Sequence, residues 1–283
     1  MARRKRTGKR THGGPAPPAR PPRRSAHRRP LARWAAAIAV IVLLVGGGLL
    51  LAGLLPGGDD DGPRTAAIVD QLSLTQPNPD FIEHATDILE RAGFVVDYYR
   101  GEQVTVDFYR GLPKLGYDAI ILRVHSGQLW LDAGEGVVTQ EPYVSLFTGE
   151  PYSESKYLEE QRRARVVEAV YNEGEGTPIF AVAAPFIKHS MEGEFEGTLI
   201  VMMGCEGFGS DGAARAFLAR GASAFISWDK QVSAEHTDAA TERLLEKMLV
   251  ERLPVEDAVA QTAAEVGPDP AYGAQLKVLT AER

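Results

Sequence analysis

The sequence predicts an α/β domain with a mostly parallel sheet and helices on both faces, preceded by one transmembrane helix. From about residue 65 to the end, short apolar runs alternate with segments of helical periodicity, a pattern typical of a parallel sheet covered by helices. Before this region, residues 34–55 contain no charged residue. About 20 apolar residues suffice to cross the hydrocarbon core of a bilayer.

The first 33 residues differ in composition from the rest of the chain. They contain twelve Lys and Arg, six Pro and no acidic residue, so the remaining 19 basic and 38 acidic residues give positions 34–283 a formal charge of −19. Such a proline-rich, like-charged segment cannot bury a core and is predicted to be disordered. Because an apolar run follows, a juxtamembrane polybasic tail is favoured over a nucleic-acid-binding arm.

These features predict four parts: a basic cytoplasmic tail (1–33), a transmembrane anchor (34–55), a linker (56–64) and an α/β domain (65–283). The basic flank stays in the cytoplasm by the positive-inside rule, which places the acidic domain outside it. The apolar run is longer than that of a typical signal peptide and has no clear A-x-A site, which favours an uncleaved anchor over a cleaved signal. We therefore expect a single-pass cell-membrane protein.

The domain begins with a short apolar strand at 66–69. A helix is expected at 80–92, after Pro79 and up to Gly93, followed by a strand at 94–99 and a short helix at 104–112. The continuous apolar run DAIILRV, 118–124, predicts a strand buried on both faces. Residues 128–153, rich in glycine and aromatic residues, predict a hairpin excursion, and residues 154–171 a polar helix.

In the second half, buried strands are expected at 178–184 and 198–203, a helix at 213–219 and a strand at 222–227. Two amphipathic helices, 238–252 and 255–266, precede a last strand at 275–279. In such sheets ligands bind at the carboxyl ends of the strands, so the loops after the strands are where chemistry is expected.

Two of these loops carry the candidate catalytic residues. His125 directly follows the strand DAIILRV, and Cys205, the only cysteine of the chain, follows the strand TLIVMM. A neighbouring imidazole helps to form a nucleophilic thiolate and can pass a proton to a leaving group. Gly127 and Gly204 allow the backbone to approach a substrate carbonyl. The alternative is that Cys205 is a small buried hydrophobic residue.

A strand ending in His, and a later strand ending in a small residue and Cys, resemble the caspase-like (clan CD) cysteine peptidases, such as gingipains, legumains and separases. The stretch LIVMMGCEGFGSDGAARAFLARGASAFISW extends the resemblance, which covers the whole outer domain. It implies that Cys205 is the nucleophile, that His125 is the general acid and base, and that the amides of Gly127 and Cys205 line an oxyanion hole. In the family Gly usually follows the His, whereas here Ser126 does.

Further residues are candidates for substrate binding. Asp70 ends the first strand, and Trp228 and Asp229 end a later one. The two carboxylates would form a pocket for an Arg or Lys side chain, which the acidic domain also favours; otherwise they are loop or capping residues. No pattern typical of a zinc site or a phosphate loop is present, so we expect no metal, no cofactor and no nucleic-acid partner.

Two functions remain open at this point. The first is a membrane-anchored extracytoplasmic cysteine endopeptidase with a His125–Cys205 dyad. The second is a non-catalytic, caspase-like or flavodoxin-like domain that binds a peptide or protein partner at the cell surface.

The predicted topology is testable on intact cells. Protease added from outside should digest the acidic domain and spare the basic tail, which immunoblotting against tags at the two ends would show. Protection of the chain beyond about Asp59 would contradict the orientation.

Overall fold

The computed structural model describes residues 62–129, 143–171 and 176–282. The predicted tail and anchor, residues 1–55, lie outside these ranges. Within them, no helix has the length and apolar character needed to cross a membrane.

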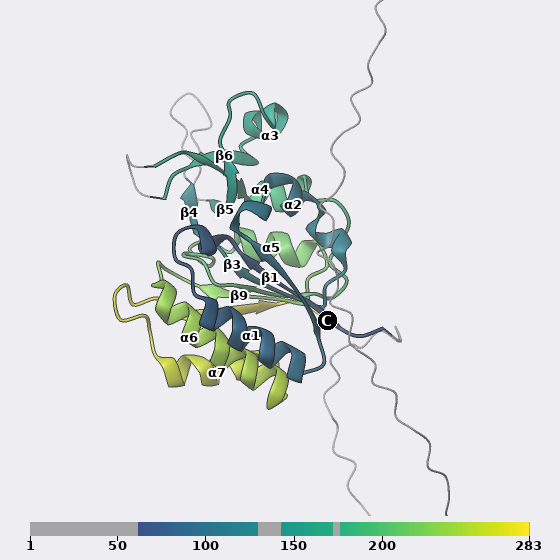
Figure 1. Ribbon diagram of the computed structural model, residues 1–283, viewed down its shortest axis with the longest axis vertical. Coiled ribbons are helices and arrows are strands. Elements are labelled where there is room, and N and C mark those ends of the chain that lie inside the picture. Colours follow the sequence, from purple (N-terminus) through teal and green to yellow (C-terminus); the bar gives the residue numbers. More distant parts are fainter. Residues whose placement is uncertain (1–61, 130–142, 172–175, 283) are drawn as a thin grey trace, which may run out of the picture.

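The main sheet has six strands (Figure 1). In spatial order they are β10 (Leu276–Thr280), β9 (Ala224–Trp228), β8 (Leu199–Met202), β3 (Ala119–Arg123), β1 (Thr65–Asp70) and β2 (Val95–Arg100). All neighbours pair in parallel except β10, which is antiparallel to β9. The expected parallel α/β sheet is thus confirmed, and β3 and β8 are neighbours within it.

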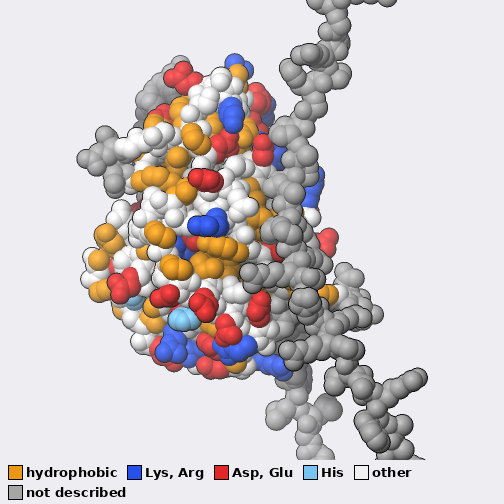
Figure 2. Space-filling view, viewed as in Figure 1, with side chains coloured by type: hydrophobic (Ala, Val, Ile, Leu, Met, Phe, Trp, Pro, Cys, Tyr) orange, Lys and Arg blue, Asp and Glu red, His pale blue; other side chains and the backbone are white. Residues whose placement is uncertain are grey.

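Helices cover both faces of this sheet. Successive residues of each strand point to opposite sides, and the apolar strands therefore have an apolar surface on each face for helices to cover. On β1, Ala66 and Ile68 pack with α1 (Pro79–Arg91), α6 (Ala234–Leu245) and α7 (Val255–Val266). Ala67 and Val69 pack on the other side with α2 (Val106–Gly111), α4 (Ala184–His189) and α5 (Gly212–Ala219). Figure 1 shows the two groups of helices on opposite sides of the sheet. The outer surface over α1, α6 and α7 is mostly charged (Figure 2).

A second, antiparallel sheet packs on the same face as α2, α4 and α5. Its strands lie in the order β4 (Ser126–Leu129), β5 (Tyr143–Pro151), β7 (Ile179–Ala183) and β6 (Val166–Ala169). Val144 of β5 and Val182 of β7 belong to the same core cluster as Leu122 of β3. β4 begins three residues after β3 ends, so this second sheet starts at the carboxyl edge of the first.

Two expectations were wrong. Residues 178–184 form β7 of the second sheet and not a strand of the parallel one, because β5 and β6 flank it. Residues 154–171 contain only a short helix, α3 (Leu158–Arg162), and then β6. Tyr157 and Ala164 on either side of α3 have positive φ, which interrupts a helix, and the β-branched pair Val166–Val167 favours the strand.

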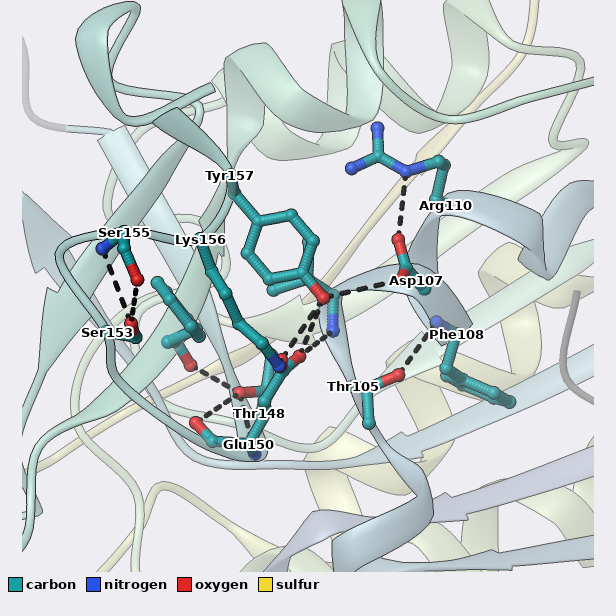
Figure 3. Close-up of polar contacts among 12 residues, drawn as sticks. Thr105, Asp107, Phe108, Arg110, Thr148, Glu150, Ser153, Ser155, Lys156 and Tyr157 are labelled. Carbon is teal, nitrogen blue, oxygen red and sulfur yellow. Dashed lines mark hydrogen bonds and ion pairs between the residues drawn. The ribbon is translucent and has the colours of Figure 1, made fainter. Parts of the chain in front are cut away.

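A cluster of polar side chains links the second sheet to α2 (Figure 3). Glu150 of β5 is 8 % exposed and accepts a hydrogen bond of 3.2 Å from the backbone N–H of Val106. Its carboxylate also accepts from the Tyr157 hydroxyl at 3.1 Å and pairs with Lys156 at 2.8 Å. This buried carboxylate is therefore satisfied from three directions and fixes β5 against α2.

A second buried cluster centres on Arg123, the last residue of β3. The guanidinium is 1 % exposed and lies 2.8 Å from Asp70 at the end of β1 and 2.8 Å from Asp238 on α6. It also donates to the carbonyl oxygen of Gln76, while Asn78 donates to Asp238. The Arg123 cluster thus ties two strand ends, α6 and the β1–α1 connection together.

Replacing Arg123 by Met should lower the free energy of unfolding by about 3–5 kcal/mol, because two buried carboxylates lose their partner. Denaturant unfolding measures this loss. The matched control is Arg91→Met, which removes an exposed guanidinium paired with Asp87 and Glu246 and should change the midpoint little. Equal effects of the two substitutions would show that the Arg123 cluster contributes little to stability.

Candidate functional site

His125 and Cys205 lie in the loops that follow two adjacent parallel strands. β3 and β8 pair from Ala119–Leu199 to Leu122–Met202. His125 comes two residues after the end of β3, and Cys205 three residues after the end of β8. Parallel strands end at one edge of a sheet, so residues 80 positions apart in the sequence are brought together there.

The two loops are in direct contact. The Ser126 hydroxyl donates a 2.6 Å hydrogen bond to the backbone carbonyl of Cys205. A Cβ at Gly204 would stand 2.3 Å from the Ser126 hydroxyl and 2.5 Å from the Val124 carbonyl oxygen. Only glycine therefore permits this approach, and Ser126 is the residue that joins the loops.

Two residues of the segment after β1 hold His125. Gln71, which is fully buried, accepts a 2.9 Å hydrogen bond from the backbone N–H of His125. The Thr75 hydroxyl lies 2.8 Å from Nε2 of the ring. Backbone and ring are thus both fixed, and a proton on Nε2 that is donated to Thr75 leaves Nδ1 unprotonated.

The His125 ring is also surrounded by aromatic groups. Its centroid lies 5.2 Å from that of Tyr171 and 6.0 Å from that of Phe147. Burial, and then the positive charge of Arg123, lowers the pKa of His125 below its ordinary value. The imidazole is therefore neutral at neutral pH, which is the form that accepts a proton.

Cys205 is half-buried and contacts the loop after β9. Its thiol lies 3.7 Å from the carbonyl oxygen of Val232 and 3.5 Å from the backbone nitrogen of the same residue. Burial raises the pKa of the Cys205 thiol above its ordinary value, and the Val232 backbone opposes this only in part. In a thiolate–imidazolium pair the pKa of the thiol would be lowered and that of the imidazole raised. Both shifts found here have the opposite sign, so the resting groups are a neutral thiol and a neutral imidazole.

A cavity of about 310 Å³ opens between these loops. Segments that follow β1, β3, β8 and β9, together with the α7–β10 connection, supply its walls. The lining residues are Leu72, Gln76, Val124, His125, Met203, Gly204, Cys205, Gln231, Val232, Ser233, Ala234, Thr237 and Tyr272. Its volume is at the lower end of the range for small-ligand pockets.

The other predicted site residues lie outside this lining. Gly127 is paired with Ser145 in the β4–β5 ladder. Trp228 is 1 % exposed and donates to the Thr237 hydroxyl, so it supports the wall from behind. Asp70 is paired with Arg123, and Asp229 lies 2.9 Å from Lys277. The two aspartates therefore already have cationic partners within the protein.

Sequence reasoning missed Thr75, Gln71 and Tyr171, the residues that surround His125. Thr75 and Gln71 lie in an irregular connection, and Tyr171 lies 46 positions beyond His125, so no spacing points to them. Arg123 did carry a sequence signal. A charged residue at the end of an otherwise apolar buried strand requires a buried partner, and Asp70 and Asp238 supply it.

No protein-family model matches the chain, and comparison with curated proteins gives no significant match. In the described ranges, no three or more His, Cys, Asp or Glu side chains are grouped as a metal ion would require.

The state of the thiol is testable by alkylation, because Cys205 is the only cysteine. Since the pKa of the thiol is raised, labelling with iodoacetamide should be slow at pH 7 and should increase with pH to a midpoint above 9.0. Mass spectrometry of the labelled protein at several pH values measures this. A midpoint near pH 6 would instead reveal a preformed thiolate–imidazolium pair.

Proposed function

We propose that the chain is a membrane-anchored, extracytoplasmic cysteine endopeptidase that hydrolyses peptide bonds with Cys205 as nucleophile and His125 as general acid and base. The observation that carries this proposal is the contact between two loops at one sheet edge. Ser126 and Gly204 hold these loops together, and His125 and Cys205 line the same cavity. The resemblance of the two motifs to caspase-like peptidases supports the same assignment.

The reaction begins with attack of the Cys205 sulfur on the scissile carbonyl carbon, while His125 accepts the thiol proton. The backbone N–H of Cys205, in the loop that Gly204 keeps close to His125, donates to the developing oxyanion. His125 then gives its proton to the amide nitrogen as the C–N bond breaks. Water hydrolyses the thioester, with His125 accepting its proton and returning a proton to the thiolate.

The hydrogen bonds of His125 suit this double role. The Thr75 hydroxyl lies 2.8 Å from Nε2, and in the tautomer in which Nε2 donates to it, Nδ1 would exchange protons with thiol and substrate. Because thiol and imidazole are both neutral at rest, proton transfer accompanies the attack and does not precede it. The rate should therefore fall as acid protonates His125, below the ordinary pKa of 6.5.

The location of the enzyme is part of the same proposal. It is supported by the uncharged run 34–55, the basic segment before it and the acidic domain after it. A domain on the outer side of the membrane would meet peptides or proteins as substrates.

One observation favours a second function, a non-catalytic domain that binds a peptide or protein at the cell surface. The Cys205 thiol is half-buried, and it contacts the backbone of Val232 as a packing residue would. In that case the cavity would be a binding site, and the thiol only part of its wall.

Substitution of the two residues separates these functions. Cys205→Ala should abolish peptide hydrolysis, since no other cysteine can replace the nucleophile. His125→Ala should reduce kcat/KM by about 10²–10⁴. The double variant should be no worse than Cys205→Ala, because residues that act as one unit are not additive.

The matched control is His189→Ala, which removes an exposed imidazole at the end of α4 and should leave the rate unchanged. Thermal unfolding of each variant shows whether a loss of activity is a loss of folding. If Cys205→Ala were as active as the wild type, the peptidase proposal would be contradicted and the binding function would be favoured.

A further inference from the structure

We infer that the cavity beside Cys205 binds an uncharged side chain of the substrate, apolar or amide-bearing, and rejects Arg, Lys, Asp and Glu. This inference rests on the proposed peptidase function and specifies its substrate class. It departs from the preference for Arg or Lys that the acidic sequence suggests.

The lining of the cavity carries no fixed charge. Its titratable side chains are those of His125, Cys205 and Tyr272, and none of them is a carboxylate, an ammonium or a guanidinium. The candidate catalytic pair, His125 and Cys205, is neutral at neutral pH. The deeper surface is apolar: Leu72, Val124, Met203 and Val232 are each at most 8 % exposed. The polar groups of the wall are the side chains of Gln76, Gln231, Ser233, Thr237 and Tyr272.

Three carboxylates at this sheet edge already have partners within the protein. Asp70 and Asp238 both contact the Arg123 guanidinium at 2.8 Å, and Asp70 also accepts from the Tyr98 hydroxyl. Asp229 is paired with Lys277 and accepts from the backbone N–H of Gln275. None of the three lines the cavity.

Asp269 lies behind the cavity wall and is also satisfied. It is 2 % exposed and accepts hydrogen bonds from the Ser233 amide and hydroxyl and from the amides of Ala271 and Tyr272. This carboxylate therefore joins the two loops that carry Ser233 and Tyr272. It shapes the cavity without lining it.

The physical consequence is a strong bias against charge. A guanidinium, ammonium or carboxylate that enters this cavity loses water and finds no group of opposite charge, which is costly. An apolar side chain loses only unfavourable hydration, and an amide can bond to the glutamine and hydroxyl groups of the wall. We expect discrimination of roughly 100-fold in kcat/KM.

The full-length protein is tested with a set of fluorogenic peptides that differ only in the residue before the scissile bond. Peptides with Leu, Met, Asn or Gln at this position should be cleaved, and those with Arg, Lys, Asp or Glu roughly 100-fold more slowly. Equal or faster cleavage of any charged peptide overturns the inference while leaving the peptidase function intact.

A designed variant tests the cavity itself. Ala234 lines the cavity at the first position of α6, where an acidic residue is compatible with the helix dipole. Ala234→Asp should increase the relative cleavage of Arg and Lys peptides by at least about 10-fold. The control Ala239→Asp adds the same charge at an exposed site on α6 and should leave the preference unchanged. An equal change in both variants overturns the inference.

If no peptide is cleaved, the peptidase proposal fails, and the cavity is tested by protection of Cys205 from iodoacetamide. N-acetyl-leucinamide and N-acetyl-glutaminamide at millimolar concentration should slow the labelling, and N-acetyl-argininamide and the α-amide of N-acetyl-aspartic acid should not. This pattern supports an uncharged binding site without catalysis. Protection by the charged amides, or by none of the four, overturns the inference.

Discussion

The buried charge of Arg123 constrains the whole carboxyl edge of the sheet. A guanidinium in this position is tolerated only because Asp70 and Asp238 approach it from a neighbouring strand and from α6. Its third partner, the Gln76 carbonyl, extends the constraint into the connection after β1, which begins with the 3-10 helix Gln71–Leu74. This connection carries Gln71 and Thr75, which hold the backbone and the ring of His125. The position of the imidazole therefore depends on a charge two residues before it.

The same cluster explains why an acidic domain has an uncharged cavity. At the sheet edge, Asp70 and Asp238 form ion pairs with Arg123, and Asp229 forms one with Lys277. Asp269 binds hydroxyl and amide donors of the two loops that form the wall. Net charge describes the surface and long-range steering, whereas the chemistry of a cavity depends on which side chains remain unpaired in its lining.

The sequence predicted the parallel sheet well, because strands such as 118–124 and 198–203 are continuous apolar runs that only burial on both faces explains. It predicted that His125 and Cys205 would lie at one edge for the same reason. It failed for 178–184, since an apolar run does not show whether its partners are parallel or antiparallel strands. For Asp70 and Asp229 the sequence could not show the internal cationic partners, because a carboxylate at a strand end has the same pattern whether a substrate or an internal cation pairs with it.

The neutral resting state of Cys205 and His125 bears on how the site would act. The contact of the thiol with the Val232 carbonyl is 3.7 Å long, and a thiol is a weak hydrogen-bond donor. Little stabilisation would therefore be lost if this contact were replaced by one with a substrate. In the tautomer in which Nε2 donates to Thr75, this hydrogen bond does not need to break, because Nδ1 would exchange the proton. An uncharged substrate side chain that fills the cavity excludes water from the pair, which strengthens the attraction between thiolate and imidazolium as they form. Under the peptidase proposal, binding of such a side chain would therefore favour proton transfer from the thiol to the imidazole.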